Sequence, residues 1–335
     1  MNSEVNIKIL LAARPQGFPE ESDFEIVESE IPKVEEGHIL VKTEYLSLDP
    51  YMRGRMNDVK SYAPSVEIGD VMVGGAVGRV VESRSPLFSV GETVEGRLGW
   101  QSYALSDGIG LRRINRDLAP IQTSIGILGM PGLTAYFGFL DVCEPVPGDT
   151  VVVSAASGAV GQVVGQIAKI MGCNVVGTAG TDEKVRFIVD ELGFDVGINY
   201  KQQNVGAALD AACPKGIDVY FDNVGGFVTD AVMDRINKGA RIAICGQVSQ
   251  YNLAEPELAP RNLSILTRSQ AKMEGFLVFA YESRYDEGLD RMAGWIEDGE
   301  LKYREDIVEG LENAPKTFIG MLNGENIGKT LIKLP

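Results

Sequence analysis

The most regular hydrophobic pattern lies after Gly126, where short apolar runs alternate with segments of helical spacing. A short apolar run predicts a buried strand, and apolar residues that recur every three to four positions predict a helix packed on one face. Strands that alternate with helices are typical of βαβ units and a parallel sheet. The predicted strands are 150–154, 174–178, 219–221, 242–245 and 275–278, and the predicted helices are 160–171, 182–192, 227–238 and 284–298.

The first part of the chain has a different pattern. Residues 1–127 show strands and turns with little helical periodicity, including an apolar strand at 39–43 and a glycine-containing, bent strand at 71–81. Strand-like residues return toward the C-terminal end, so we expect 301–335 to rejoin this β-rich part. The sequence therefore predicts an α/β protein in which a β-rich domain accompanies a Rossmann-type, doubly wound parallel sheet at 128–300.

Composition and charge limit the kinds of partner that the protein is expected to bind. The 335 residues are 44% hydrophobic and 23% charged, as in soluble globular proteins, and the formal net charge is −16. Such a charge repels nucleic acid and anionic membranes. Without a signal peptide or an apolar run long enough to cross a membrane, we expect a cytoplasmic protein. The cysteines are far apart and fit free thiols in a reducing compartment; they are Cys143, Cys173, Cys213 and Cys245.

A single histidine and scattered cysteines leave few options for catalysis. His38 lies in the turn-like segment Glu35–His38 and is expected to be a surface residue rather than a general base. A zinc site needs clustered cysteine and histidine ligands, and the sequence has no such cluster. The sequence therefore predicts no metal, and it disfavours chemistry that needs a Lewis acid or a histidine base.

A glycine-rich turn joins the predicted strand 150–154 to the next helix. Residues Ala155 to Gly161 follow the pattern G-x-G-x-x-G, with Ala156 in the first glycine position. Gly158 lets the backbone approach a pyrophosphate, Gly161 allows the helix to pack closely on the strand, and the helix start offers free N–H groups. The alternative is an ordinary glycine-rich turn, but the position between a strand and a helix favours a dinucleotide site.

The end of the second predicted strand bears on the choice of cofactor. A site specific for NAD usually has an acidic residue here, bonded to the ribose 2′-hydroxyl. Residues 177–181 contain no acid, and Lys184 follows within one helical turn. Lys184 alone would be interpreted as a solvated helix residue. Together with the missing acid it favours a 2′-phosphate, so the sequence predicts NADPH.

Five motifs follow one another along the chain, and they are Asp49–Arg53, Met130–Tyr136, Ala155–Gly161, Phe221–Gly226 and Cys245–Asn252. Together they resemble the zinc-independent medium-chain dehydrogenase/reductases, in the branch of prostaglandin reductases, leukotriene hydroxydehydrogenases and alkenal double-bond reductases. The resemblance covers essentially the whole chain and implies that the β-rich part is a GroES-like catalytic domain. It also implies a homodimer, because related enzymes pair through the edge of the cofactor sheet.

The resemblance implies which residues form the site. It places Ala159, Val160, Gly161 and Gln162 at the diphosphate, Lys184 and Tyr200 at the 2′-phosphate, and Asn223 along the cofactor. It places Cys245, Gly246, Gln247, Val248, Ser249 and Tyr251 beside the nicotinamide, together with the backbone of Phe276, Leu277 and Val278, and Asn326 at the closing edge. Tyr51 resembles a substrate-pocket tyrosine. Plainer alternatives are a buried strand at 276–278, a turn asparagine at 223 and a packing tyrosine at 51.

Reduction of an activated C=C bond needs fewer protein groups than alcohol oxidation. The nicotinamide supplies hydride, and the protein orients the acceptor and stabilises negative charge on the carbonyl oxygen. Tyr251 is the best candidate for that donor, although its ring could simply pack against the cofactor. The sequence therefore predicts an NADPH-dependent reductase of α,β-unsaturated ketones or aldehydes. A quinone reductase of the same superfamily and a catalytically silent NADPH-binding protein are the alternatives, and the loop with Pro256 and Pro260 is expected to help select the substrate.

Overall fold

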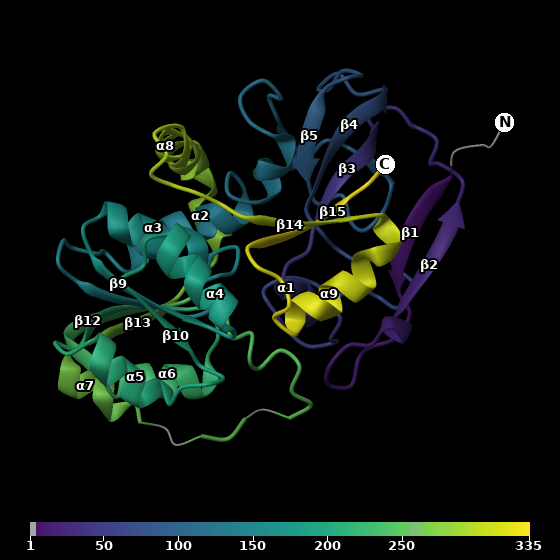
Figure 1. The fold of residues 1–335 in the computed structure, drawn as a ribbon. Coiled ribbons are helices and arrows are strands. Elements are labelled where there is room, and N and C mark those ends of the chain that lie inside the picture. Colours follow the sequence, from purple (N-terminus) through teal and green to yellow (C-terminus); the bar gives the residue numbers. More distant parts are fainter. Residues whose placement is uncertain (1–4, 256, 260–261) are drawn as a thin grey trace. The chain divides into compact units, whose positions relative to one another are not determined.

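The computed structural model describes residues 5–255, 257–259 and 262–335, which form two compact units (Figure 1). Unit 1 comprises 1–126 together with 305–335, and unit 2 comprises 127–304. The division into domains at 1–127, 128–300 and 301–335, expected from the sequence, stays a prediction. Among the described residues, no helix is long and apolar enough to cross a membrane.

Unit 2 is built on a parallel sheet of six strands in the order β10-β9-β8-β11-β12-β13. The order reverses between β8 and β11, and ligands of such sheets bind at the carboxyl ends of the strands at that point. The fold class predicted from the sequence is therefore confirmed. The strands are β8 (Thr150–Val153), β9 (Asn174–Ala179), β10 (Val196–Asn199), β11 (Ile217–Asp222), β12 (Ile236–Ile244) and β13 (Lys272–Gly275).

Helices cover both faces of this sheet, with α3 and α4 on one face and α5 and α6 on the other (Figure 1). The apolar stripe of α3 packs Val163, Val164 and Ile167 against the strands, all with no exposed surface. The helices are α2 (Met130–Phe137), α3 (Gly161–Ile170), α4 (Asp182–Arg186), α5 (Val205–Ala212), α6 (Gly226–Met233), α7 (Ser264–Ser269) and α8 (Tyr285–Glu297).

Two sequence predictions in unit 2 are wrong. The helix predicted at 227–238 ends at Met233, because Ile236 already begins β12 and pairs with Ile217 of β11. The strand predicted at 275–278 ends at Gly275, and a 3-10 segment begins at Val278. Phe276 leaves the ladder because its ring fills the space above Gly138, where a Cβ atom would lie 2.2 Å from the ring.

Unit 1 contains a mostly antiparallel sheet that includes two strands of the return segment, 305–335. β15 pairs with β3, so the chain's last strand lies beside one of its first. β1 and β2 form a separate ribbon, and α1 (Tyr51–Arg55) and α9 (Ala314–Leu322) complete the unit. The strands are β1 (Asn6–Leu11), β2 (Phe24–Ser29), β3 (Ile39–Ser47), β4 (Ala76–Ser83), β5 (Thr93–Gly96), β6 (Tyr103–Ser106), β7 (Arg112–Arg113), β14 (Glu305–Glu309) and β15 (Lys329–Lys333).

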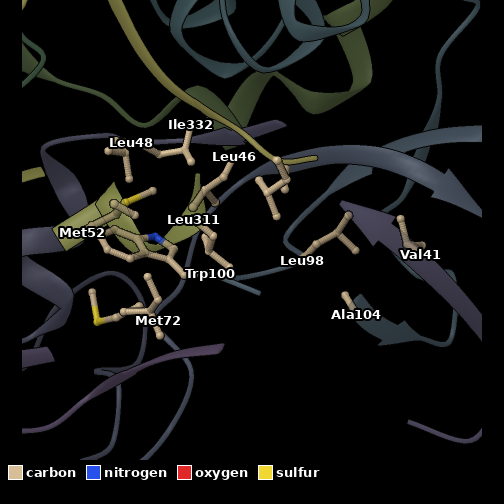
Figure 2. Close-up of a cluster of buried hydrophobic side chains, with 14 of the residues drawn as sticks. Val41, Leu46, Leu48, Met52, Met72, Leu98, Trp100, Ala104, Leu311 and Ile332 are labelled. Carbon is tan, nitrogen blue, oxygen red and sulfur yellow. The ribbon is translucent and has the colours of Figure 1, made fainter. Parts of the chain in front are cut away.

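The core of unit 1 is centred on Trp100, which is fully buried. Its ring stacks on Phe24 at 5.7 Å and meets Phe318 of α9 edge to face at 5.6 Å. Leu48 and Met52 lie beside this ring (Figure 2). Because these two residues flank the turn that starts α1, the core anchors that turn from both sides.

Candidate cofactor and substrate site

The turn after β8 has the shape that the glycine pattern predicts. Ala155 adopts a left-handed conformation, with φ 48°. Gly161 has to be glycine, because a Cβ atom there would lie 2.3 Å from the carbonyl oxygen of Ala155. Ala156 occupies the first glycine position without strain on its neighbours, because it packs against Gly177 of β9, where a Cβ atom would come within 2.7 Å.

Backbone N–H groups converge at the start of α3. Among the described residues, none accepts a hydrogen bond from the N–H groups of Ala159, Val160 and Gly161. Three consecutive donors at a helix start fit an anionic group such as a diphosphate. The N–H of Gln162 instead donates to the carbonyl of Gly158 at 3.0 Å, so its expected contact with the diphosphate competes with a bond inside the turn.

The side chain of Gln162 has a structural role that the sequence did not reveal. Gln162 is buried, and its Oε1 accepts a hydrogen bond from the N–H of Arg304 at 3.0 Å. Gln166, one turn later, bonds both the N–H and the carbonyl of Lys302 at 2.8 Å. The two glutamines therefore fix the last residues of unit 2 to α3.

Polar side chains meet where β9 and β10 end. Thr181 caps α4 by accepting a hydrogen bond from the N–H of Lys184 at 3.2 Å, and the Lys184 side chain is largely buried. A Cβ atom at Gly180 would lie 3.0 Å from the hydroxyl of Tyr200. Burial raises the pKa of Tyr200, so its hydroxyl is a neutral donor at physiological pH. A cation and a neutral hydroxyl at adjacent strand ends fit a ribose 2′-phosphate.

The first acidic residue after the end of β9 already bonds another side chain. Asp182 accepts a hydrogen bond from the side-chain amide of Asn199 at 2.6 Å. Its carboxylate therefore ties the start of α4 to the end of β10. Residues 177–181 contain no acid, and the acid that follows them, Asp182, bonds Asn199 instead. Both observations agree with the choice of NADPH.

A fully buried carboxylate organises the carboxyl end of β11. Asp222 has no exposed surface, and its two oxygens accept five hydrogen bonds at 2.7–3.2 Å. All five donors are uncharged: the hydroxyls of Ser154, Tyr220 and Thr229 and the N–H groups of Val224 and Gly225. Asp222 belongs to the motif Phe221–Gly226, but no local sequence signal predicts this role.

The same turn holds Asn223 in place. Its N–H donates to the hydroxyl of Ser154 and its side-chain amide donates to the Ser154 carbonyl, both at 2.8 Å. Ser154 follows β8, so these bonds join the two strands between which the sheet order reverses. Asn223 therefore lies at the switch point, as expected for a residue along a bound dinucleotide.

The segment after β12 is bonded to this turn. The N–H groups of Cys245 and Gly246 donate to the carbonyl of Asp222 at 2.8 and 3.1 Å, and the N–H of Val248 donates to the carbonyl of Asn223 at 3.2 Å. Ser249 adds two bonds to the carbonyl of Val224, one from its N–H and one from its hydroxyl. The structure thus brings the predicted residues 245–249 together with Asn223.

Tyr251 ends this segment, and its hydroxyl is directed at the segment's own backbone. The oxygen accepts a hydrogen bond from the N–H of Gln247 at 3.4 Å. A Cβ atom at Gly246 would lie 3.1 Å from the same oxygen, so glycine permits this approach. Tyr251 is partly exposed. Its position after β12 places it at the carboxyl edge of the sheet, where the sequence predicted it.

The predicted residues 276–278 differ in exposure. The ring of Phe276 lies 6.2 Å from that of Phe221, edge to face, and Val278 is buried. Leu277 is 44% exposed. The nicotinamide contact expected from the backbone of these residues stays a prediction. Pro256 and Pro260, expected to help select the substrate, lie outside the described residues.

Two predicted site residues belong to unit 1. Tyr51 starts α1 and is half-buried against the Trp100 core. Burial, and then the nearby charge of Asp49, raise the pKa of its hydroxyl far above the usual value, so Tyr51 remains protonated. Asn326 donates from its side chain to the carbonyl of Gly328 at 3.0 Å. The roles of both residues toward a cofactor or substrate stay predictions.

Comparison with known proteins identifies the family. Residues 8–114 match the family described as the N-terminal domain of oxidoreductase, and residues 159–294 match the one described as zinc-binding dehydrogenase. The NADPH-dependent curcumin reductase of Escherichia coli is 46% identical, over 98% of this chain and 97% of its own length. The NADP(+)-dependent 2-alkenal reductase of Nicotiana tabacum is also 46% identical, over 98% and 97%. The chain belongs to the medium-chain dehydrogenase/reductases.

A solved structure extends this likeness to the fold. CurA from Vibrio vulnificus in complex with NADPH is 47% identical, with a TM-score of 0.95 over 98% of this chain and 99% of that one. These relatives fall in the zinc-independent branch predicted from the motifs, so the oxidoreductase assignment is confirmed. Although one matching family is described as zinc-binding, the described residues contain no group of three or more histidine, cysteine, aspartate or glutamate residues that could hold a metal.

Proposed function

We propose that this medium-chain reductase uses NADPH to reduce the C=C bond of α,β-unsaturated ketones and aldehydes. Two relatives that match almost the whole chain are named for NADPH or NADP(+) and for the substrates curcumin and 2-alkenals. A 2-alkenal carries a C=C bond conjugated with its aldehyde. The proposal transfers this substrate class, but no individual substrate, to the present chain.

The cofactor is held by unit 2 in this proposal. The N–H groups of Ala159, Val160 and Gly161 bind the diphosphate, and Lys184 with Tyr200 binds the 2′-phosphate. The backbone of Phe276 to Val278 and the segment Cys245 to Ser249 line the nicotinamide. When bound, the nicotinamide supplies the hydride that reduces the substrate.

The observation that carries the proposal is the attachment of the Tyr251 segment to the switch point. Five hydrogen bonds join residues 245–249 to residues 222–224, and both segments follow strands that end at the same sheet edge. A tyrosine hydroxyl at this edge is a donor for the carbonyl oxygen of an enone. Hydride addition to the β-carbon leaves negative charge on that oxygen, and a donor that is already oriented stabilises this charge.

A substrate panel tests the proposal. NADPH and NADH oxidation is measured with an enone, an enal, a quinone and a saturated ketone at equal concentration, before and after dialysis against a strong chelator. We expect turnover of the enone and the enal with NADPH, little turnover with NADH, and no effect of the chelator. Faster turnover of the quinone would favour a quinone reductase, and no turnover of any acceptor would favour a silent NADPH-binding protein.

We also propose that the chain forms a homodimer through the edge of the cofactor sheet. β13 is one of the two edge strands of this sheet, and the apolar side chain of Met273 on it is 36% exposed. An exposed strand edge offers unpaired backbone groups to a second copy. Sedimentation equilibrium at micromolar concentration distinguishes a dimer from a monomer.

A further inference from the structure

A buried lysine lies at the start of the last strand of unit 1. The Lys329 side chain is only 3% exposed, and its Nζ donates to the carbonyls of Leu48 at 2.6 Å and Thr330 at 3.0 Å. It also forms an ion pair with Asp49 across 3.2 Å. Asp49 is 7% exposed, so both charges of this pair are removed from water. A lysine is rarely buried unless its charge is paired.

Two of the residues that Lys329 contacts, Leu48 and Asp49, belong to the turn that carries Tyr51. Leu48 and Asp49 precede it, and the carbonyl of Asp49 accepts the N–H of Met52 at 3.1 Å. The hydroxyl of Ser47 donates to the second carboxylate oxygen of Asp49. The lysine therefore holds the backbone and the side chain of the turn at the same time.

A second acid faces the same lysine. Glu305 pairs with Lys329 in the register of β14 and β15, and its Oε2 accepts a hydrogen bond from Gln122 at 3.1 Å. Its Oε1 is buried without a hydrogen-bond partner among the described residues, and burial raises the pKa of Glu305. Asp49 is thus the carboxylate that Lys329 contacts directly, with Glu305 as a more distant neighbour.

A buried ion pair is a poor source of stability, because the cost of removing two charges from water offsets their attraction. An apolar pair of the same volume would serve the core equally well. What the ion pair provides is a fixed orientation, since Nζ engages three oxygen atoms, two of which belong to residues just before Tyr51. The charge of Asp49 also lies close enough to Tyr51 to affect its hydroxyl.

We infer that Lys329 is a positioning residue: by neutralising Asp49 and holding the carbonyl of Leu48, it fixes the turn that presents Tyr51 to the substrate. The substrate role of Tyr51 rests on the proposed function, whereas the effect on the turn does not. The return segment therefore contributes to the substrate site through one side chain, that of Lys329. Lys329 lies 278 residues after Tyr51 in the sequence.

A double-mutant cycle tests this inference in the full-length protein. The variants are Lys329→Met, Asp49→Asn and the two combined. Lys333→Met is the matched control, because Lys333 lies on the same strand but is exposed and pairs with Glu309 at the surface. Three quantities are measured: KM and kcat for an enone, Kd for NADPH, and hydrogen–deuterium exchange of residues 48–56.

Lys329→Met should raise KM for the enone by about ten- to a hundredfold, as expected for a misplaced substrate group. Exchange at 48–56 should become faster, and Kd for NADPH should change less than about twofold, because the cofactor contacts lie in unit 2. The double variant leaves no charge unpaired, but it still lacks the Nζ atom that holds the Leu48 carbonyl, so KM and exchange at 48–56 should stay raised. Lys333→Met should match the wild type in every measurement.

Two results would overturn the inference. One is wild-type KM and wild-type exchange at 48–56 in Lys329→Met. The other is a double variant with wild-type KM and wild-type exchange, which would assign the loss in Lys329→Met to the unpaired charge of Asp49 alone. If Lys329→Met does not fold, the double variant decides: raised KM and fast exchange at 48–56 in the folded double variant support the inference, and wild-type values contradict it. If the wild type reduces no enone, the proposed function fails, and the exchange data alone decide the role of Lys329.

Discussion

The two units each bury a carboxylate beneath a functional segment, but they stabilise it in opposite ways. In unit 2, Asp222 accepts five hydrogen bonds from uncharged donors on its own turn, on β11, on α6 and next to β8. In unit 1, Asp49 is paired with one cation, Lys329, that reaches it from the far end of the chain. The first arrangement spreads the charge over several dipoles, and the second neutralises it with a single cation, beside one hydroxyl donor from Ser47.

This difference determines how each site should respond to change. A carboxylate held by several neutral donors keeps most of its bonds when one is lost. A carboxylate held by one buried lysine leaves an unpaired charge when either partner is removed. We therefore expect the cofactor edge of unit 2 to tolerate an isosteric substitution better than the Tyr51 turn of unit 1.

The largest predicted effect is a loss of folding stability, which should be greater in Asp49→Asn than in Asp222→Asn. Asp49→Asn leaves the buried Lys329 without the counter-ion that it contacts directly and should reduce the free energy of unfolding by about 3–5 kcal/mol. Asp222→Asn keeps the oxygen that accepts four of the bonds, and the Thr229 hydroxyl can turn to accept from the new amide, so we expect a loss of about 1–3 kcal/mol. Urea unfolding with equal m-values gives both numbers. Equal losses, or the reverse order, would remove the contrast between the units.

Tyr251→Phe tests the catalytic part of the unit 2 edge. Removing the hydroxyl should lower kcat for an enone by about ten- to a thousandfold, while Kd for NADPH stays close to that of the wild type. The long hydrogen bond from the N–H of Gln247 is a small structural loss. Tyr281→Phe is the control, since its ring stacks on Phe137 in the same unit. An unchanged kcat, with chemistry shown to be rate-limiting by a deuteride isotope effect, would assign Tyr251 a packing role only.

Lys184→Ala tests the other end of the same edge. Charge-assisted hydrogen bonds contribute about 1.5–3 kcal/mol, so kcat/KM for NADPH should fall by about ten- to a hundredfold. The value for NADH should change little, because that cofactor has no 2′-phosphate. Arg186→Ala, an exposed cation on the same helix, is the matched control. A parallel loss with both cofactors would rule out the 2′-phosphate role of Lys184.

The smallest predicted effect concerns the thiols. Burial raises the pKa of Cys143 and Cys245 to about 12 and of Cys173 and Cys213 to about 11, and the charge of Asp222 contributes at Cys245. At pH 8 only about one in a thousand of the Cys173 and Cys213 thiols is then ionised, and about one in ten thousand of the Cys143 and Cys245 thiols. A disulfide reagent should therefore label the native protein slowly and the unfolded protein at all four cysteines. Rapid labelling of the native protein at pH 8 would contradict this.

The raised pKa values of the thiols should also lower the stability of the protein at high pH. A thiol whose pKa is raised by folding releases its proton first in the unfolded state, where the pKa is about 8.5. The unfolded state then binds fewer protons than the folded one, so stability should decrease as the pH rises above that value.

Asp222→Asn should modestly increase the labelling rate of Cys245 and leave the other three cysteines unchanged.

The sequence predicted unit 2 better than unit 1, for physical reasons. Strand periodicity and the Gly158–Gly161 turn are local signals, and they located the sheet edge at which we propose that the diphosphate binds. The bonds of Asp222 could not be foreseen, because they join residues on β11, in the turn after it, on α6 and next to β8. The pairing of Lys329 with Asp49 was equally hidden, since no local pattern connects a strand near the C-terminus with a turn before α1. The helix predicted at 227–238 was wrong because strand pairing in the sheet overrode a helical pattern.

The most direct test of the proposed function follows the hydride itself. The protein is incubated with an enone and with NADPH that carries deuterium at both C4 positions of the nicotinamide, and the product is analysed by NMR. We predict a saturated ketone with one deuterium on the former β-carbon and an intact carbonyl group. An allylic alcohol with deuterium on the former carbonyl carbon, or no deuterated product at all, would contradict the assignment as a double-bond reductase.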